Sequence, residues 1–308
     1  MDNLNRDQFK GIVAPLVTPL LDNDTLDHDG LERLIEHTIK GGVHSIFVLG
    51  TTGEFASLSY KLRYELLERT CKMVNGRKPV LVGITDSANA ETLNLAGKAS
   101  DFGADAVVLS PPYYYATNQS ELLGYLKRLM VQIPLPLFLY NIPAHTKVGF
   151  EPSTIKAAAE IAGIIGIKDS SGDMPYLNSA FHLLRSHPEF LFLVGREEMT
   201  SPFVLMGGHG GVNGGANMFP RLFVELYNAS VSKDFEKILP LQQKVMQCST
   251  SIYKVGNYGS SYLKGLKCAL SVMGICSDYM AEPYRRFEKS ERQEIEKRLE
   301  ELNYKELI

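Results

Sequence analysis

Lys168 ends a short apolar run, residues 163–167, and turn-forming residues follow it at once. Such a run is typical of a strand buried on both faces. Burial disfavours the charged ammonium form, so a lysine at the mouth of an apolar pocket can be a neutral amine near neutral pH and attack a carbonyl carbon to form a Schiff base. In the alternative interpretation the long side chain only reaches from the strand end into solvent.

Three other apolar runs end in residues that would complete such a site. They are residues 50–54 (Gly-Thr-Thr-Gly-Glu), 113–115 (three tyrosines) and 140–143 (Tyr-Asn-Ile-Pro). A tyrosine can transfer protons, and a glycine turn with hydroxyl groups can hold a carboxylate with its backbone N–H groups. With a nucleophilic lysine, these groups predict a 2-oxo acid site without a metal ion. Each segment taken alone could instead be an ordinary turn, aromatic packing or a tyrosine at a barrel rim.

The elements that must position these residues alternate along the chain. Eight aliphatic or β-branched runs occur in its first two-thirds, and most are separated by amphipathic stretches. Alternation of this kind favours parallel βαβ units. A doubly wound sheet could also produce it, but eight units without a phosphate-binding fingerprint after the first favour a closed (β/α)8 barrel. The runs are 12–19, 45–50, 80–85, 106–112, 135–143, 164–168, 191–195 and 210–214.

Helix signals lie between the runs. Two amphipathic stretches stop at residues 41–42 and at Gly76, and the third closes at residues 102–103. Ser87 and Ser120 are placed as N-caps of the helices that follow them. These signals predict helices between successive strands.

The alternation ceases near residue 219, and three helical patterns follow. Residues 223–252 and 256–275 are apolar-periodic, and residues 290–293 predict a capping box for a last helix. We predict a barrel core over residues 1–222 and a C-terminal helical appendage over residues 223–308, packed on the barrel.

Composition excludes several classes of function. The net charge of −3 provides no basic surface for nucleic acid. The four cysteines show no CxxC pair and the seven histidines no metal-ligand spacing, which favours buried thiols in a reduced compartment. No apolar run approaches membrane-spanning length, and the first residues lack the apolar core of a signal peptide. We therefore expect a cytoplasmic protein with no membrane or nucleic-acid partner.

Four motifs together resemble those of the dihydrodipicolinate synthase and N-acetylneuraminate lyase family of class I aldolases. They are residues 50–54, 112–114, 140–143 and 166–169, and the resemblance covers roughly residues 8–300. It implies a (β/α)8 barrel with a C-terminal helical region. It also implies a Schiff base between Lys168 and pyruvate or another 2-oxo acid, without a cofactor. Tyr140 would relay protons, while Thr51 and Thr52 would bind the carboxylate and orient Tyr140.

The resemblance also implies a partner subunit. Tyr114 is similar to the family tyrosine that crosses a tight-dimer interface into the neighbouring site, and the usual assembly is a homotetramer made of two such dimers. The substrates would be a small 2-oxo acid and an aldehyde. The other residues expected to bind them are Gly53, His145, Gly195, Arg196, Glu197 and Val212.

Two departures from the family pattern bear on the aldehyde. Dihydrodipicolinate synthases usually carry an arginine two residues after the proline of Tyr-Asn-x-Pro, where this chain has His145. Sialic acid lyases usually show Gly-x-Asp-Glu after strand seven and a serine in the strand-eight loop. Here residues 195–198 read Gly-Arg-Glu-Glu, and Gly214 occupies the loop position. We therefore expect an aldolase for a related 2-oxo acid, such as a 2-keto-3-deoxy sugar acid or a 4-hydroxy-2-oxo acid.

Several alternatives stay open. Arg196 could bind a distal carboxylate and Glu197 substrate hydroxyls, or Arg196 could only pair with Glu197 or Glu198 at the surface. The chain could also be a dehydratase that uses the same Schiff base to expel water. The chain could also belong to a different functional class, as a catalytically silent barrel that only binds a 2-oxo acid.

Overall fold

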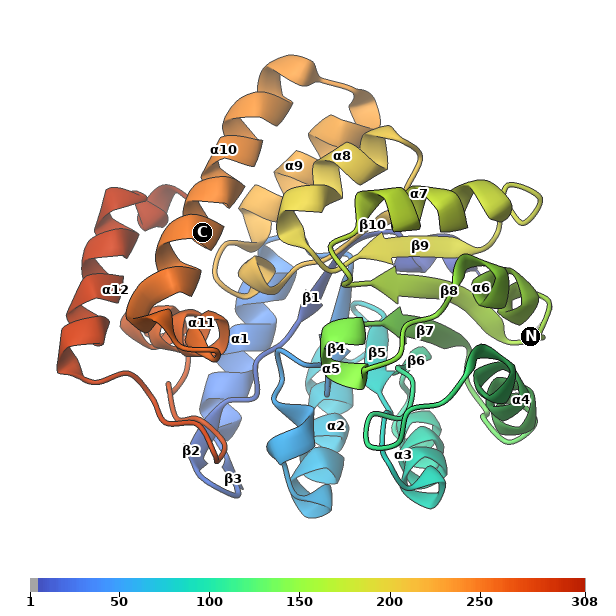
Figure 1. The fold of residues 1–308 in the computed structure, drawn as a ribbon. Helices are drawn as coiled ribbons and strands as arrows, with labels where there is room; N and C mark the ends of the chain where they lie inside the picture. The colour runs from blue at the N-terminus through green and yellow to red at the C-terminus, as the bar shows by residue number, and fades with distance from the viewer. Residues whose placement is uncertain (1–4, 308) are drawn as a thin grey trace.

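Eight parallel strands close into a barrel in the order β1-β10-β9-β8-β7-β6-β5-β4 in the computed structural model, which describes residues 5–307 (Figure 1). Each predicted run overlaps one of these strands, so the predicted (β/α)8 barrel is confirmed. A short hairpin of β2 (Leu20–Asp22) and β3 (Thr25–Leu26) follows the first strand. The barrel strands are β1 (Gly11–Pro15), β4 (Ser45–Val48), β5 (Val80–Gly83), β6 (Ala106–Leu109), β7 (Leu137–Asn141), β8 (Ile164–Asp169), β9 (Leu191–Val194) and β10 (Gly210–Val212).

Helices surround the barrel strands (Figure 1). The C-caps of the first three are Gly41, Asn75 and Phe102, at or next to the glycines that predicted the helix ends. The helices that cover the strands are α1 (His28–Lys40), α2 (Tyr60–Val74), α3 (Asn89–Asp101), α4 (Gln119–Met130), α6 (Pro152–Ala159), α7 (Met174–Leu183), α8 (Thr200–Leu205) and α9 (Pro220–Ser232).

The two predicted N-caps are wrong. Helix α3 begins after Ala88, which makes no side-chain cap, and α4 begins after Asn118. The Asn118 side chain accepts from the backbone N–H of Glu121, and the Glu121 carboxylate accepts from the N–H of Asn118. These two reciprocal hydrogen bonds satisfy two backbone N–H groups that the helix itself leaves without a partner. Asn118, and not Ser120, is therefore the N-cap of α4.

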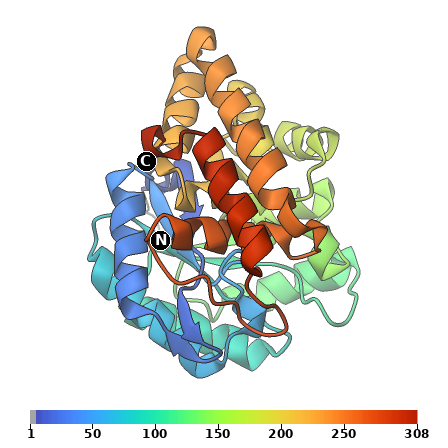
Figure 2. The same ribbon diagram turned by 90° about the vertical axis from the view of Figure 1, so that its left-hand side faces the viewer.

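The C-terminal region contains α10 (Phe235–Ser251), α11 (Ser261–Val272) and α12 (Lys289–Glu301), and Figure 2 shows α10 and α12 on one side of the barrel. The predicted element over 223–252 is two helices, because Lys233 adopts a left-handed conformation (φ 56°) and Asp234 caps α10. The predicted capping box at residues 290–293 is wrong. Helix α12 begins after Glu288 without a side-chain cap, and the Ser290 hydroxyl donates to Glu291.

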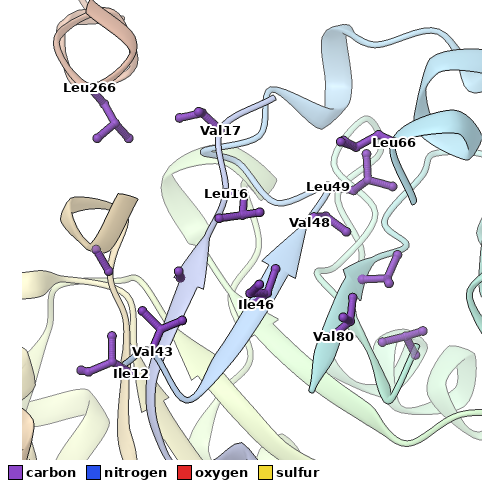
Figure 3. Close-up of a cluster of buried hydrophobic side chains, with 14 of the residues drawn as sticks. Ile12, Leu16, Val17, Val43, Ile46, Val48, Leu49, Leu66, Val80 and Leu266 are labelled. Atoms are coloured by element: carbon purple, nitrogen blue, oxygen red, sulfur yellow. The ribbon is translucent and has the colours of Figure 1, made fainter. Parts of the chain in front are cut away.

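The strands are buried on both faces, as parallel barrel strands are. Val13, Phe47 and Phe138 fill the barrel interior. Alternate residues such as Ile12 and Ile46 belong to the outer core between strands and helices. Leu266 of α11 joins this outer core (Figure 3), so the C-terminal region packs into the same apolar layer as the barrel. All four cysteines are free and buried, as predicted.

Candidate active site

A cavity of about 340 Å³ opens at the carboxyl ends of β4, β5, β6 and β7. One wall comes from the barrel and includes Phe47, Thr51 and Tyr140. The opposite wall comes from the C-terminal region, through Tyr262, Leu263 and other residues. The helical region is therefore part of the site. The polar residues that line the cavity are Thr51, Glu54, Ser57, Thr85, Ser110, Tyr113, Tyr140, His145, Thr146, Ser260, Tyr262 and Tyr284.

Lys168 lies beside two of the residues that line this cavity, Phe47 and Tyr140. Parallel pairing of β7 with β8 sets Lys168 directly beside Tyr140. The Lys168 side chain is 6% exposed, and its Nζ lies 4.0 Å from the ring centroid of Tyr140 and 5.1 Å from that of Phe47. Among residues 5–307, no carboxylate forms a salt bridge with Lys168. An amine held against two aromatic rings at the edge of a cavity is well placed to attack a carbonyl carbon.

Because Gly195 has no side chain, the side chain of Lys168 has room beside it. A Cβ atom at this position would lie 3.3 Å from Cε of Lys168 and would overlap the hydroxyl of Ser170. This position therefore requires glycine, because the β9 end approaches the reactive side chain closely. The structure thus brings Gly195 to the predicted site, against the lysine stem.

The Tyr140 hydroxyl lies 3.2 Å from Oγ1 of Thr51. Thr52 has a different partner, because its Oγ1 lies 3.1 Å from the hydroxyl of Tyr262 on α11. The two threonines thus point to opposite walls of the cavity, and only Thr51 contacts Tyr140. This arrangement gives Tyr140 a hydroxyl neighbour through which a proton can pass.

The residues after Tyr140 and Lys168 lock the two strand ends together. Asn141 donates from Nδ2 to Asp169 (2.7 Å), and its Oδ1 accepts from the N–H of Phe150. Asp169 also accepts from the Ser171 hydroxyl (2.8 Å), and burial raises the pKa of its carboxyl. Residues 140–143 and 166–169 therefore carry both the reactive groups and the hydrogen bonds that hold them in register.

The tyrosines after β6 divide between two places. Tyr113 lines the cavity. Tyr114 is 67% exposed and stacks edge-on against Tyr115, with ring centroids 5.0 Å apart. Lys147 donates to the backbone carbonyl of Tyr114. Tyr114 therefore stands at the surface of this chain, outside the lining of its own cavity.

Three other predicted residues lie away from the cavity. Arg196 is exposed, with its Nε over Gly172, and no ion pair joins it to a carboxylate in the described part of the chain. Val212 packs in the barrel interior. Glu197 is buried, accepts from the Tyr253 hydroxyl (3.1 Å) and from the N–H of Gly215, and burial raises its pKa to about 7. His145, by contrast, lines the cavity.

The sequence does not indicate Tyr262 as a site residue, because the apolar periodicity of residues 256–275 predicts only a packing helix. The Tyr262 hydroxyl occupies the place that a Cβ at Gly214 would take, and its ring packs edge-on against Tyr253 at 4.8 Å. Burial raises the pKa of Tyr262 well above its ordinary range, so its hydroxyl stays protonated. No periodic pattern could have placed it beside Thr52, which lies 210 positions earlier.

The fold and this lysine define a (β/α)8-barrel enzyme of the Schiff-base aldolase class. The dihydrodipicolinate synthetase family model matches residues 8–302. The structure of a dihydrodipicolinate synthase from Bacteroides thetaiotaomicron is 58% identical, with a TM-score of 0.93 over 95% of this chain and 98% of that chain.

Two further relatives agree. A prophage protein of E. coli K12 from the dihydrodipicolinic acid synthase family, solved with pyruvate, is 29% identical, with a TM-score of 0.91 over 96% of this chain and 99% of that one. A 4-hydroxy-tetrahydrodipicolinate synthase from Methanocaldococcus jannaschii is 33% identical over 86% of this chain and 89% of that protein. The chain therefore belongs to the dihydrodipicolinate synthetase family. It is a pyruvate-dependent lyase of the Schiff-base class, which confirms the predicted family and reaction class. No helix among residues 5–307 is long and apolar enough to cross a membrane.

Proposed function

We propose that Lys168 forms the imine with pyruvate and that Tyr140, backed by Thr51, transfers the protons. The lysine amine adds to the ketone carbon, and the carbinolamine loses water to form the imine. Loss of a proton from the neighbouring carbon produces an enamine, which bonds to the aldehyde carbon. Hydrolysis then releases the product and restores the amine. The observation that carries this proposal is the distance of 4.0 Å between the Nζ of Lys168 and the ring centroid of Tyr140, a residue that lines the cavity.

The turn at residues 51–54 would bind the pyruvate carboxylate. Thr51 lines the cavity beside Tyr140, and the turn is closed by hydrogen bonds from the N–H of Gly53 to Gly50 and of Glu54 to Thr51. With the turn closed in this way, the Thr51 hydroxyl suits an anion, because it needs no reorganisation when the charge arrives.

We propose a neutral hydroxylated aldehyde as the second substrate, so that the enzyme makes or cleaves a 2-keto-3-deoxy sugar acid. No arginine of residues 5–307 lines the cavity, whereas hydroxyl groups of Thr85, Ser110, Ser260 and Tyr284 do. A histidine at residue 145 would be a weaker partner for a second carboxylate than an arginine, because it lacks the bidentate guanidinium. The exposed position of Arg196 does not favour a distal carboxylate.

Aspartate semialdehyde is the second candidate. It is favoured by the 58% identity to the dihydrodipicolinate synthase from Bacteroides thetaiotaomicron. A dehydratase would use the same imine and differ only in the bond that breaks. The non-catalytic barrel is disfavoured, because Lys168 and Thr51 each lie close to Tyr140, at 4.0 Å from its ring centroid and 3.2 Å from its hydroxyl.

We propose that the enzyme is a cytoplasmic homotetramer, a dimer of dimers, in which Tyr114 reaches the cavity of a partner subunit. The exposed pair of Tyr114 and Tyr115 supports this assembly, because two large aromatic rings at the surface are typical of interface residues. The buried free cysteines are compatible with a reducing compartment.

Borohydride trapping with pyruvate tests the imine. Intact-mass analysis should show one adduct per chain, absent from Lys168→Ala, and an adduct on another lysine would refute the assignment. Comparing kcat/KM for 2-keto-3-deoxy sugar acids, 4-hydroxy-2-oxoglutarate, N-acetylneuraminate and aspartate semialdehyde then tests the aldehyde. Efficient condensation with the semialdehyde alone would support the second candidate and contradict the first.

A further inference from the structure

Lys267 is a fully buried lysine far from the Schiff-base site in sequence. It lies on α11, and its Nζ donates to Oε1 of Glu54 (2.6 Å) and to the backbone carbonyl of Thr18 (2.9 Å). Glu54 accepts a second bond at Oε2 from the N–H of Ala281 (3.0 Å). A buried charge pair of this kind is costly to assemble and strongly constrains the segments that carry it.

The partner of Lys267 is the last residue of the turn proposed to bind the pyruvate carboxylate. Glu54 is held in the left-handed conformation (φ 56°), which side chains other than glycine rarely adopt. The preceding residue, Gly53, accepts at its carbonyl from the Thr18 hydroxyl (2.7 Å). Because Lys267 binds both Glu54 and Thr18, it ties the turn and the segment beneath it to one helix.

The same helix makes a second attachment to the turn. Tyr262, five positions before Lys267, lies 3.1 Å from Oγ1 of Thr52. Two residues of the turn are thus fixed from the C-terminal region, Thr52 by Tyr262 and Glu54 by Lys267. Thr51, on the same turn, is left to face Tyr140.

We propose that α11 is the positioning element of the carboxylate-binding turn, with Lys267 and Tyr262 as its positioning residues. Helix α11 determines where the turn stands relative to Lys168 and Tyr140, and thereby the affinity of the site for pyruvate. Lys267 is not among the cavity-lining residues, so it acts through Glu54. The proposal rests on the proposed imine at Lys168 and is independent of the aldehyde.

The test compares wild type with E54Q/K267M. The double variant removes both buried charges together, which avoids an unpaired charge in the core, and glutamine can still accept from Ala281. R33M is the matched control. Arg33 of α1 donates to the carbonyl of Ile275 (2.8 Å), so its loss loosens the C-terminal region without touching the turn. The measurements are the thermal midpoint and the pyruvate concentration for half-maximal borohydride trapping.

We expect E54Q/K267M to need roughly tenfold more pyruvate, because small displacements of positioned groups cost up to about 10²-fold. At saturation it should still reach one adduct on Lys168, whereas R33M should match wild type in its pyruvate requirement. A double variant with the wild-type requirement, or an equal increase in R33M, would overturn the inference.

If the double variant does not fold, Tyr262→Phe tests the same inference, because it removes only the hydroxyl that contacts Thr52. Its pyruvate requirement should then exceed that of wild type. An unchanged pyruvate requirement in that variant would also contradict the inference. Absence of trapping in the wild type would instead refute the proposed function, so the two failures are distinct.

Discussion

Lowering the pH should destabilise the barrel through His209, at the end of the barrel opposite the cavity. The Nδ1 of His209 accepts from the backbone N–H of Phe192 (3.0 Å), which requires a neutral ring. Burial, then the charge of Lys10, lowers its pKa from 6.5 to about 4, although Asp7 acts in the opposite direction. The ring also packs edge-on against Phe181.

The direction and size of the effect follow from these values. The unfolded chain binds a proton at His209 near pH 6.5, whereas the folded chain does so only near pH 4. The stability that the neutral ring provides is therefore complete above pH 6.5 and is lost as the pH falls toward 4. At about 1.4 kcal/mol per pH unit, the loss is at most about 3 kcal/mol.

Chemical denaturation at fixed protein concentration between pH 4 and 7 measures this loss. The comparison variant is His209→Asn, because an asparagine side-chain oxygen can accept from Phe192 without titrating in this range. The free energy of unfolding should fall more steeply for wild type than for the variant between pH 6.5 and 4. Pyruvate trapping at pH 7 should be equal in both, since His209 lies far from the cavity-lining residues. Parallel pH profiles for the two proteins would refute the reasoning.

Three further predictions concern the site and the assembly. Tyr140→Phe should lower kcat by about 10²–10⁴-fold while pyruvate trapping persists, and an undiminished kcat would remove Tyr140 from proton transfer. Gly195→Ala should displace Lys168 through contact with its Cε and with Ser170, so trapping at a fixed pyruvate concentration should fall sharply; wild-type trapping would contradict the close approach. Light scattering should find at least a dimer, and Tyr114→Ala should lower turnover. A fully active monomer would exclude a shared site.

Local sequence patterns were sufficient to predict the barrel and the neighbouring positions of Lys168 and Tyr140. Alternating apolar runs and helix stops predicted the strands, because a parallel strand buried on both faces must be apolar throughout. Lys168 and Tyr140 were predictable as neighbours, since each lies toward the carboxyl end of its run and the carboxyl ends of barrel strands meet at one face. The helix starts were less predictable, because Ser120 and Asn118 are both competent caps and only the hydrogen bonds select between them.

The contacts that complete the site depend on tertiary packing. Glu54 and Lys267 are 213 positions apart. Apolar periodicity predicts that the helix of Lys267 is buried, but it does not predict which charged residue pairs with Lys267. Arg196 and Glu197 are adjacent in sequence, yet one points to solvent and the other into the core, because the short helix that begins at Glu197 turns their side chains apart. Sequence alone determined the barrel and the place of Lys168 near the carboxyl end of its strand, since both follow from local patterns of apolarity. Tertiary structure decided which groups surround that lysine, because the direction of a side chain depends on segments that meet only when the chain folds.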